Sequence, residues 1–406
     1  MKSGANSPES DKYGRIILFL GIAVGVIIIM FTFPRLLLFI SGYSPPDLTD
    51  EDKEQLKTDA ISFCGTVDLF KLPAFVNDGN DIVFINSSPR EEISGSGSRR
   101  NGRETDLWMI DSAGNNLTRL TNIKDVENFG YDPVSGKIAF TGYENGSTSV
   151  YVLPDTSSQP VKLPGPLTHM YFSSWSPDGT RIVVSGINMS EYSSSTHKAD
   201  GVKVPGHTGK YCRLYIMNED GSNPREIALS YFVGRTIIAE TSWSPDGKEF
   251  VFPLYTTEES GLAIANADTG ETRMITEYYM PRSGYPGIGD YYPAWSPNGD
   301  LIAFVREGDI WTIRPDGTGE QEILSDGDAG DISWNPDGTR LAYLNGSYVG
   351  IIDPDGSNPA RIANYQLGPV SWSPDGGKIT YAPELGRRIR ILKLTPLVLE
   401  INEFKT

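Results

Sequence analysis

Two patterns of apolar residues divide this chain. Residues 16–33 form an uncharged apolar run, and the apolar character resumes from Leu36 to Ile40. From residue 74 onward, apolar residues instead alternate with polar ones in short segments, namely R-I-V-V-S (181–185), E-F-V-F-P (249–253), L-I-A-F-V (301–305), R-L-A-Y-L (340–344) and K-I-T-Y-A (378–382). A period of two residues predicts β-strands with one buried face. The first pattern indicates a membrane helix, and the second indicates an all-β domain.

The first apolar run predicts a single transmembrane helix over residues 16–41. Its 18 uncharged residues (16–33) span ~27 Å as an α-helix, close to the thickness of the hydrocarbon core of a bilayer. A cleaved signal peptide is the alternative interpretation. The run is longer than the apolar region of a usual signal peptide, and no small-residue cleavage site follows it. We therefore expect an anchor that stays in the membrane.

The charges beside this helix predict its orientation. Lys2, Lys12 and Arg15 precede the helix, whereas acidic residues follow it from Asp47 onward. Because positive residues stay on the cytoplasmic side, residues 1–15 should form a cytoplasmic tail. Residues 42–72 then form a polar linker, and the rest of the chain lies outside the cytoplasm, in the periplasm or at the cell surface.

A six-residue motif recurs along the second part of the chain. It reads S-W-S-P-D-G at 174–179, 242–247 and 371–376, A-W-S-P-N-G at 294–299 and S-W-N-P-D-G at 333–338. Two degenerate copies precede these, with Tyr131 and Phe75 in place of the Trp. Proline fixes φ at the first corner of a turn, and glycine takes the position with positive φ. Each copy therefore predicts a hairpin whose aromatic ring packs between neighbouring sheets.

A second turn follows each hairpin at a regular distance. It appears at 111–114, 218–221, 267–270, 314–317 and 353–356, between an apolar strand and a short strand that ends in Leu or Ile. Two hairpins in about 40 residues make a four-stranded sheet, which is the blade of a β-propeller. Seven hairpins predict seven blades over residues 73–396. Six blades is the alternative, if the first unit is not a complete blade.

Closure of the ring has two solutions in the sequence. Leu397–Ile401, within the C-terminal strand or tail of residues 397–406, could complete the last blade, or an N-terminal strand such as Val67–Leu72 could do so. The two cysteines, Cys64 and Cys212, are either two separate thiols or one disulfide between the linker and the propeller. The sequence decides neither question.

Charge limits the classes of partner. The formal net charge of the 406-residue chain is −17 and its pI is about 4.7. An acidic surface repels phosphate backbones, so we expect no nucleic-acid partner. The same charge suits a basic partner or a divalent cation.

The W-S-P-D-G hairpin, followed by an alternating strand and a D-G turn, resembles the WD40-like repeat called PD40 over residues 74–395. That repeat occurs in TolB-like propellers and in the propeller halves of tricorn and dipeptidyl-peptidase-IV-type proteases. The resemblance implies that Trp175, Trp243, Trp295, Trp334 and Trp372 are scaffold residues without a catalytic role. TolB itself is a soluble periplasmic protein with an additional N-terminal α/β domain, in whose place this chain carries a membrane helix and a linker.

Three segments are candidates for a binding surface, and a fourth is a candidate metal site. Glu277–Tyr292 is rich in residue types common at protein interfaces, and from it we predict a contact surface of Tyr278, Tyr279, Arg282, Tyr285, Tyr291 and Tyr292. Gly186–Tyr211 and Ser87–Glu104 are long polar insertions that suit recognition loops or plain surface loops. Asp326, Asp328 and Asp331 are the candidate ligands of a calcium ion, although their spacing is not that of an EF-hand.

These features predict a membrane-anchored extracytoplasmic propeller that binds a protein partner or acts as a scaffold. A structural subunit of a membrane or cell-surface complex is the alternative, and a hydrolase in the channel of the propeller is a further one. No catalytic motif such as G-x-S-x-G is present, so we expect that the chain is not an enzyme and needs no cofactor.

Overall fold

The computed structural model describes residues 73–89, 103–123, 125–144, 147–187, 212–227, 241–255, 259–279, 290–364, 369–381 and 390–394. All of these lie in one compact unit, Thr58–Thr406. The predicted tail, membrane helix, linker and C-terminal segment lie outside the described residues. Among the residues described, none belongs to a helix that is long and apolar enough to cross a bilayer.

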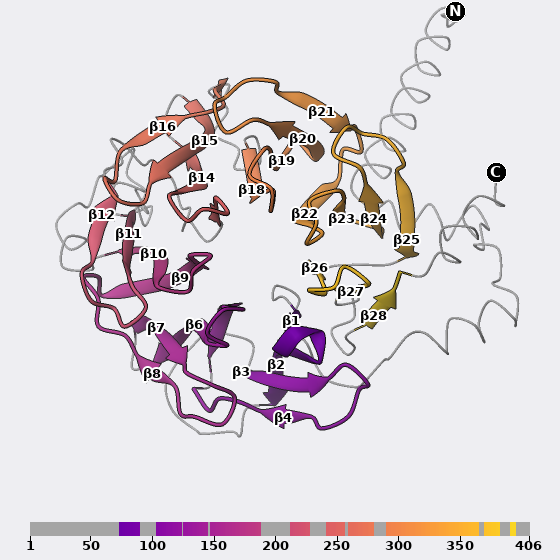
Figure 1. The fold of residues 1–406 in the computed structure, drawn as a ribbon. Helices are drawn as coiled ribbons and strands as arrows, with labels where there is room; N and C mark the ends of the chain where they lie inside the picture. The colour runs from indigo at the N-terminus through magenta and orange to yellow at the C-terminus, as the bar shows by residue number, and fades with distance from the viewer. Residues whose placement is uncertain are drawn as a thin grey trace, which may run out of the picture. The chain divides into compact units, whose positions relative to one another are not determined.

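The described residues form seven antiparallel sheets, each built from consecutive strands. The first strand of each sheet lies nearest the common centre (Figure 1). These innermost strands are β1 (Ala74–Val76), β5 (Val126–Tyr131), β9 (His169–Trp175), β13 (Ser242–Trp243), β18 (Asp290–Trp295), β22 (Ala329–Trp334) and β26 (Val370–Trp372). The second strands are β2 (Asp81–Pro89), β6 (Ile138–Glu144), β10 (Arg181–Ile187), β14 (Glu249–Tyr255), β19 (Ile302–Arg306), β23 (Leu341–Asn345) and β27 (Lys378–Tyr381).

The outer half of each sheet follows the same order. The third strands are β3 (Arg103–Asp111), β7 (Ser147–Leu153), β11 (Cys212–Asn218), β15 (Glu259–Asn266), β20 (Asp309–Ile313), β24 (Tyr348–Ile352) and β28 (Arg390–Lys393). The fourth strands are β4 (Thr118–Arg119), β8 (Val161–Lys162), β12 (Arg225–Ile227), β16 (Thr272–Met274), β21 (Gln321–Leu324) and β25 (Ala360–Asn364). In the fourth sheet an additional short strand, β17 (Tyr278–Tyr279), pairs with β15 beyond β16.

Each sheet contacts the next, and the seventh contacts the first through β1 and β26. The chain is therefore a closed seven-bladed β-propeller (Figure 1), which confirms the prediction of seven blades over six. The first unit is a complete blade despite its degenerate motif. Its N-D-G turn, Asn77–Gly79, forms a single 3-10 turn between β1 and β2.

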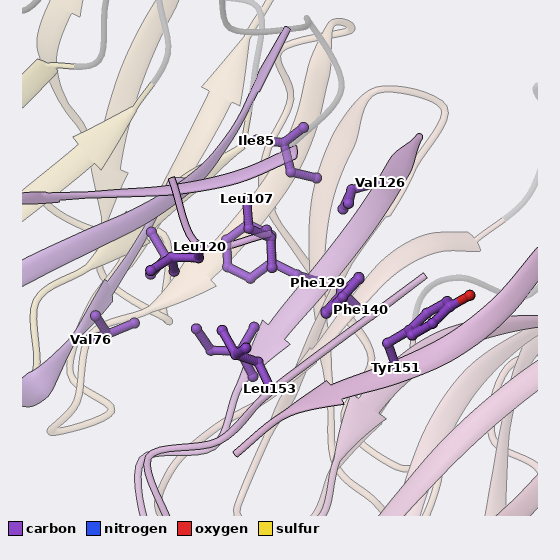
Figure 2. Packing of buried hydrophobic residues seen from close by; sticks show 11 residues of the cluster. Val76, Ile85, Leu107, Leu120, Val126, Phe129, Phe140, Tyr151 and Leu153 are labelled. Carbon is purple, nitrogen blue, oxygen red and sulfur yellow. The ribbon is translucent and has the colours of Figure 1, made fainter. Parts of the chain in front are cut away.

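The core consists of clusters between adjacent blades. One cluster joins the first two blades, where Leu107 and Leu120 meet Phe129 and Phe140 (Figure 2). The motif tryptophans belong to such clusters and are 7–9% exposed. Trp243, for example, packs against Val183 and Leu214 of the preceding blade. The alternating pattern thus places one face of each sheet against each neighbour, as expected for a propeller.

The motif tryptophans also join blades by hydrogen bonds. In four blades the indole N–H donates to the residue that precedes the aromatic position of the preceding blade. These bonds run from Trp175 to Gly130 O (3.0 Å), Trp243 to Ser174 Oγ (3.0 Å), Trp334 to Ala294 O (2.9 Å) and Trp372 to Ser333 O (3.1 Å). Trp295 differs, since its indole N–H donates to Gly299 O in its own turn. The ring of inner strands is therefore held together by polar contacts as well as by packing.

Each S-P-D-G turn is a compact hydrogen-bonded unit. In the third blade, the N–H of Gly179 donates to Ser176 O (2.9 Å), and the Ser176 hydroxyl donates to the carboxylate of Asp178 (2.6 Å). The φ of Gly179 is 67°, and the six equivalent glycines likewise have positive φ, as the sequence predicts. Neighbouring turns contact each other, and a Cβ added to Gly79 of the first blade would lie 3.3 Å from Pro374 of the seventh. The turns therefore form a closed ring of their own.

Candidate functional site

The order of antiparallel strands divides the propeller into two ends. The turns between the first and second strands and those between the third and fourth lie at one end, which we call the turn end. Backbone bonds such as Ser112 N to Asn80 O (2.7 Å) and Ala267 N to Lys248 O (2.7 Å) connect these two sets of turns. The opposite end carries the links from second to third strands and from each blade to the next. We call it the connection end.

The described strands that flank the three candidate segments meet those segments at the connection end. Residues 90–102 join β2 to β3, residues 188–211 join β10 to β11, and residues 280–289 join β17 to β18. The flanking strands therefore end on the same side of the propeller. Sequence reasoning located the insertions without placing them together, because the shared end follows only from the strand order.

The two described ends of the tyrosine-rich segment lie in different blades. Tyr278 and Tyr279 form the outer strand β17 of the fourth blade, paired with Ser260 and Glu259. Tyr291 and Tyr292, in contrast, belong to the innermost strand of the fifth blade. Arg282 and Tyr285 lie outside the described residues. The predicted surface thus begins at the outer edge of the fourth blade and ends at the inner edge of the fifth.

Tyr292 occupies a bulge in the innermost strand of the fifth blade. The strand pairing shifts register between Tyr291 and Ala294, and Tyr292 has a φ of 52° and is 38% exposed. A bulge of this kind redirects a side chain out of the regular pleat. Tyr292 is one of five large apolar or aromatic side chains that are exposed among the described residues, and it is the one located at the inner edge of the connection end.

Beside this bulge lies a buried ion pair that sequence reasoning missed. Arg306 donates to both carboxylate oxygens of Asp290, at 2.6 and 2.9 Å, and the Thr276 hydroxyl donates to the same carboxylate. Asp290 is fully buried, and the guanidinium lies 5.0 Å from the centre of the Trp311 ring. Thr276 belongs to the fourth blade, so the pair fixes the start of β18 against its neighbour. The signal in the sequence was an Asp and an Arg at the far ends of one hairpin.

The three aspartates proposed as calcium ligands have separate partners. Asp326 accepts a hydrogen bond from the Tyr348 hydroxyl, and Asp331 accepts one from the backbone N–H of Val370 (3.1 Å) in the next blade. Asp328 is exposed beside the β23–β24 hairpin at Gly346. Among the described residues there is no group of three or more side chains suited to hold a metal ion. Calcium binding at these residues stays a prediction.

The same corner contains an aromatic and cationic stack. The guanidinium of Arg361 lies 4.1 Å from the centre of the Tyr348 ring, and Tyr343 meets that ring edge-on. Burial, followed by the hydrogen bond to Asp326, raises the pKa of Tyr348. Tyr348 therefore stays protonated and donates to Asp326 at neutral pH. These contacts stabilise the packing of the fifth blade against the sixth at the connection end.

Comparisons with known proteins agree with this architecture. The chain is 32% identical over 117 residues to the Tol-Pal system protein TolB of Anaeromyxobacter dehalogenans. The match covers 28% of this chain and 24% of that protein, so the chain spans about a quarter of the length of these relatives. The expected resemblance to TolB-like propellers is confirmed at this level. No family model matches the chain.

Among solved structures, two oligogalacturonate lyases share the fold. One, determined in complex with manganese, superposes with a TM-score of 0.59 at 12% identity and covers 84% of this chain and 92% of its own. The other, from Vibrio parahaemolyticus, has a TM-score of 0.57 at 13% identity and covers 83% and 92%. Identities this low show a common fold and nothing finer.

These matches contradict the expectation that the chain is not an enzyme. That expectation rested on the absence of a sequence motif such as G-x-S-x-G, and the lyases show that this fold serves catalysis. The physical reason is that a propeller brings residues from separate blades together at its centre. A catalytic group built in this way leaves no contiguous motif in the sequence.

Proposed function

We propose that this chain is a membrane-anchored extracytoplasmic propeller that binds protein partners through its connection end. The observation that carries the proposal is that the two ends of the propeller differ in the length and regularity of their connecting segments. The strands that flank the long insertions and the tyrosine-rich segment meet them at the connection end, and the bulge at Tyr292 lies at the same end. Binding residues are concentrated on loops that a rigid scaffold positions, and insertions in repeat proteins gather on the binding face.

The turn end supports the proposal by its regularity. Its turns repeat the same hydrogen bonds from blade to blade, as in Ser176–Asp178 and Ser244–Asp246. In these turns the serine hydroxyl donates to the aspartate of the same turn. We therefore assign a scaffold role to the turn end and recognition to the opposite end.

The contact surface that we propose contains Tyr278, Tyr279, Arg282, Tyr285, Tyr291 and Tyr292. Tyrosine and arginine supply large contact areas and directional hydrogen bonds at protein interfaces. The similarity to a protein named for the Tol-Pal system supports a role among other proteins. The apolar run of residues 16–41 and the charges beside it support an anchor with the propeller outside the cytoplasm.

Affinity capture of the full-length chain from native membranes in mild detergent tests this proposal. Quantitative mass spectrometry of the wild type should identify protein partners that are depleted at least tenfold by the double variant Tyr285→Ala/Tyr292→Ala. Val134→Ala is the matched control, because Val134 is 66% exposed at the turn end. Equal recovery of every partner with both variants would reject the connection end as the binding surface.

The same measurement addresses the alternative of a structural subunit. Partners at a fixed stoichiometry that survive extraction would support a permanent membrane or cell-surface complex. Partners that appear only after chemical cross-linking would support transient binding. Recovery of the chain in the soluble fraction, without detergent, would contradict the proposed anchor.

A further inference from the structure

Arg181 bridges the third and fourth blades at the turn end. Its guanidinium donates to Gly247 O (2.8 Å) and to the Asp268 carboxylate (2.8 Å), which belong to the two turns of the fourth blade. The same guanidinium lies 5.4 Å from the centre of the Trp243 ring. One arginine thus contacts a backbone oxygen, a carboxylate and an aromatic ring between neighbouring blades.

The repeat provides an equivalent position in each blade, six residues after the motif aromatic. In four blades the residue at this position is basic, namely Lys137, Arg181, Arg340 and Lys378. In the fourth blade it is Glu249, whose partner Asn266 on the third strand corresponds to Asn218 in the third blade. The junction between the fourth and fifth blades therefore has a carboxylate in place of the bridging cation.

A groove of about 640 Å³ opens beside Glu249. It is lined by Glu249, Asn266 and residues 269–273, which include the turn between the third and fourth strands of this blade. Arg273 in the wall of the groove donates to Pro315 O (3.3 Å), so the groove lies on the side of the fifth blade. Ligand sites in proteins have volumes of roughly 300–1,000 Å³. The groove is therefore large enough for a ligand.

The fifth blade presents at this junction the acceptors that Arg181 uses in the fourth. Asp316 corresponds to Asp268 in the turn between the third and fourth strands, and Gly299 O corresponds to Gly247 O in the turn between the first and second. Asp268 pairs with Arg181, whereas Asp316 forms no ion pair with another described residue. The acceptors are repeated, but the arginine is not.

The same junction contains the motif tryptophan with a different hydrogen bond. Gly299 O accepts the indole N–H of Trp295 (3.2 Å), whereas the corresponding oxygen in the fourth blade accepts the Arg181 guanidinium. Trp243, which lies under that guanidinium, keeps its bond to the preceding blade at Ser174. The groove and the redirected indole are thus two separate departures from the repeat at one junction.

Carboxylates outnumber guanidinium groups around the groove. Glu249 accepts two hydrogen bonds from Arg273, at 2.6 and 3.1 Å. Glu271 lines the groove, and it is exposed, as is Asp316 in the fifth blade. Arg314 adds one positive charge to the turn of Asp316. Three carboxylates therefore face two guanidinium groups, an arrangement that favours a further cation.

We propose that this groove binds an arginine side chain of a partner protein, together with the backbone that flanks it. The guanidinium donates to the Asp316 carboxylate and to Gly299 O, as Arg181 does to the corresponding groups at the preceding junction. Arginine suits these acceptors better than lysine, because its planar fork donates to a carboxylate and a backbone oxygen at once. The net charge of −17 favours the approach of a basic segment.

This site is an exception to the regular turn end, and it is separate from the surface proposed at the connection end. A partner could contact either end without the other. The assignment of an arginine ligand therefore does not rest on the proposed function of the tyrosine-rich segment.

Fluorescence anisotropy with labelled pentapeptides tests the proposal on the purified full-length chain in detergent. A peptide with one central arginine between glycines should bind at least about tenfold more tightly than the same peptide with citrulline, which has a similar shape but no charge. Equal affinities, or no binding of either peptide, would overturn the proposal.

Glu249→Arg supplies the missing arginine from the chain itself. It should weaken binding of the arginine peptide at least about tenfold, because the new side chain occupies the groove. Glu322→Arg makes the same charge change at an exposed residue of the fifth blade outside the groove, and it should leave the affinity within about twofold. Similar affinities of the two variants contradict the site.

A second pair of variants leaves the groove open. Asp316→Asn should weaken binding of the arginine peptide by about fivefold or more, because it removes the carboxylate that receives the guanidinium. Asp355→Asn is the matched control, since Asp355 occupies the same position in the turn of the sixth blade and is exposed. Equal binding to these two variants also rejects the assignment.

Methylguanidinium distinguishes a protein segment from a small guanidinium compound. The peptide should compete at least about tenfold better than methylguanidinium, because its backbone adds contacts in the groove. Equal competition would refute the protein ligand. These measurements need neither a native partner nor the connection end, so a failure here is distinguishable from a failure of the proposed function.

Discussion

The indole N–H of Trp334 donates to the backbone oxygen of Ala294, 2.9 Å away, and Ala294 immediately precedes the tryptophan of the preceding blade. The same relationship joins Trp372 to Ser333. Each blade is thus positioned by the residue beside the previous motif tryptophan. The repeat defines the hairpin and also the distance between successive hairpins.

Trp334→Phe should destabilise the propeller by about 1–2 kcal/mol more than Trp311→Phe. Both changes keep an aromatic ring, but the first removes a bonded N–H and leaves Ala294 O without this donor. The indole nitrogen of Trp311 is buried and has no hydrogen-bond partner within the described structure. Urea denaturation of both variants measures the difference. Equal losses would show that the bond between blades contributes nothing.

Gly179→Ala should be more destabilising than Gly136→Ala, although both glycines have positive φ, 67° and 75°. A Cβ at Gly179 would lie 2.2 Å from the Asp132 carboxylate of the preceding blade, whereas nothing lies within 4 Å of one at Gly136. Backbone strain alone costs about 1–2 kcal/mol at either site. Overpacking should add about 1–3 kcal/mol at Gly179. Thermal unfolding of the two variants tests this, and a similar loss in both would refute the contact between turns.

Asp290→Asn should cost about 3–5 kcal/mol, because it removes the fully buried carboxylate that binds the mostly buried Arg306, which keeps its ion pair with the more exposed Glu320 at 2.8 Å. Asp268→Asn is the control. Its carboxylate pairs with Arg181 at 2.8 Å but is 71% exposed, so the expected cost is below about 1 kcal/mol. Chemical denaturation in 0.15 M salt distinguishes the two. A small effect at Asp290 would mean that water solvates this pair.

Acid should weaken the turn end through its aspartates. The hydrogen bond from the Ser244 hydroxyl, followed by the backbone N–H of Lys248, lowers the pKa of Asp246 from 3.8 to about 2. The analogous bonds from Ser373 and Thr339 lower the pKa of Asp375 and Asp337. A pKa lowered by folding stabilises the folded chain above pH ~4, and this contribution disappears as the pH falls through about 2.

Ser244→Ala removes the hydroxyl that donates to Asp246, together with the hydrogen bond that this hydroxyl accepts from the backbone N–H of Glu249 (3.0 Å). At pH 6 it should lower the free energy of unfolding by about 1 kcal/mol, and its difference from the wild type should shrink between pH 4 and pH 2. Ser325→Ala, at an exposed position between β21 and β22, is the control and should follow the wild type throughout. Urea denaturation at stepped pH provides the measurement. If the difference in the free energy of unfolding between Ser244→Ala and the wild type does not change with pH, the hydrogen bond from Ser244 does not affect the titration of Asp246.

The all-β class, the seven hairpins and the glycines with positive φ were predictable from the residues alone. These features depend on interactions within six to ten residues, such as the fixed φ of Pro177 or the freedom of Gly179 at φ 67°. The buried position of the motif tryptophans was also predictable, since a large ring that ends a strand packs between sheets. Local chemistry was sufficient for each of them.

The residues that meet at the connection end became known from the folded arrangement of the blades. A simple hairpin count from the turn would place Tyr291 opposite Arg306, but the bulge at Tyr292 shifts the pairing so that Asp290 meets Arg306 instead. Asp331 meets Val370 of the next blade for a similar reason, since their contact depends on how two sheets are placed. Register shifts and contacts between blades depend on residues far apart in the chain. The repeat therefore predicted the scaffold. It did not predict that Tyr279 lies in the outer strand of the fourth blade and Tyr291 in the innermost strand of the fifth, because that separation depends on how the blades assemble into a ring.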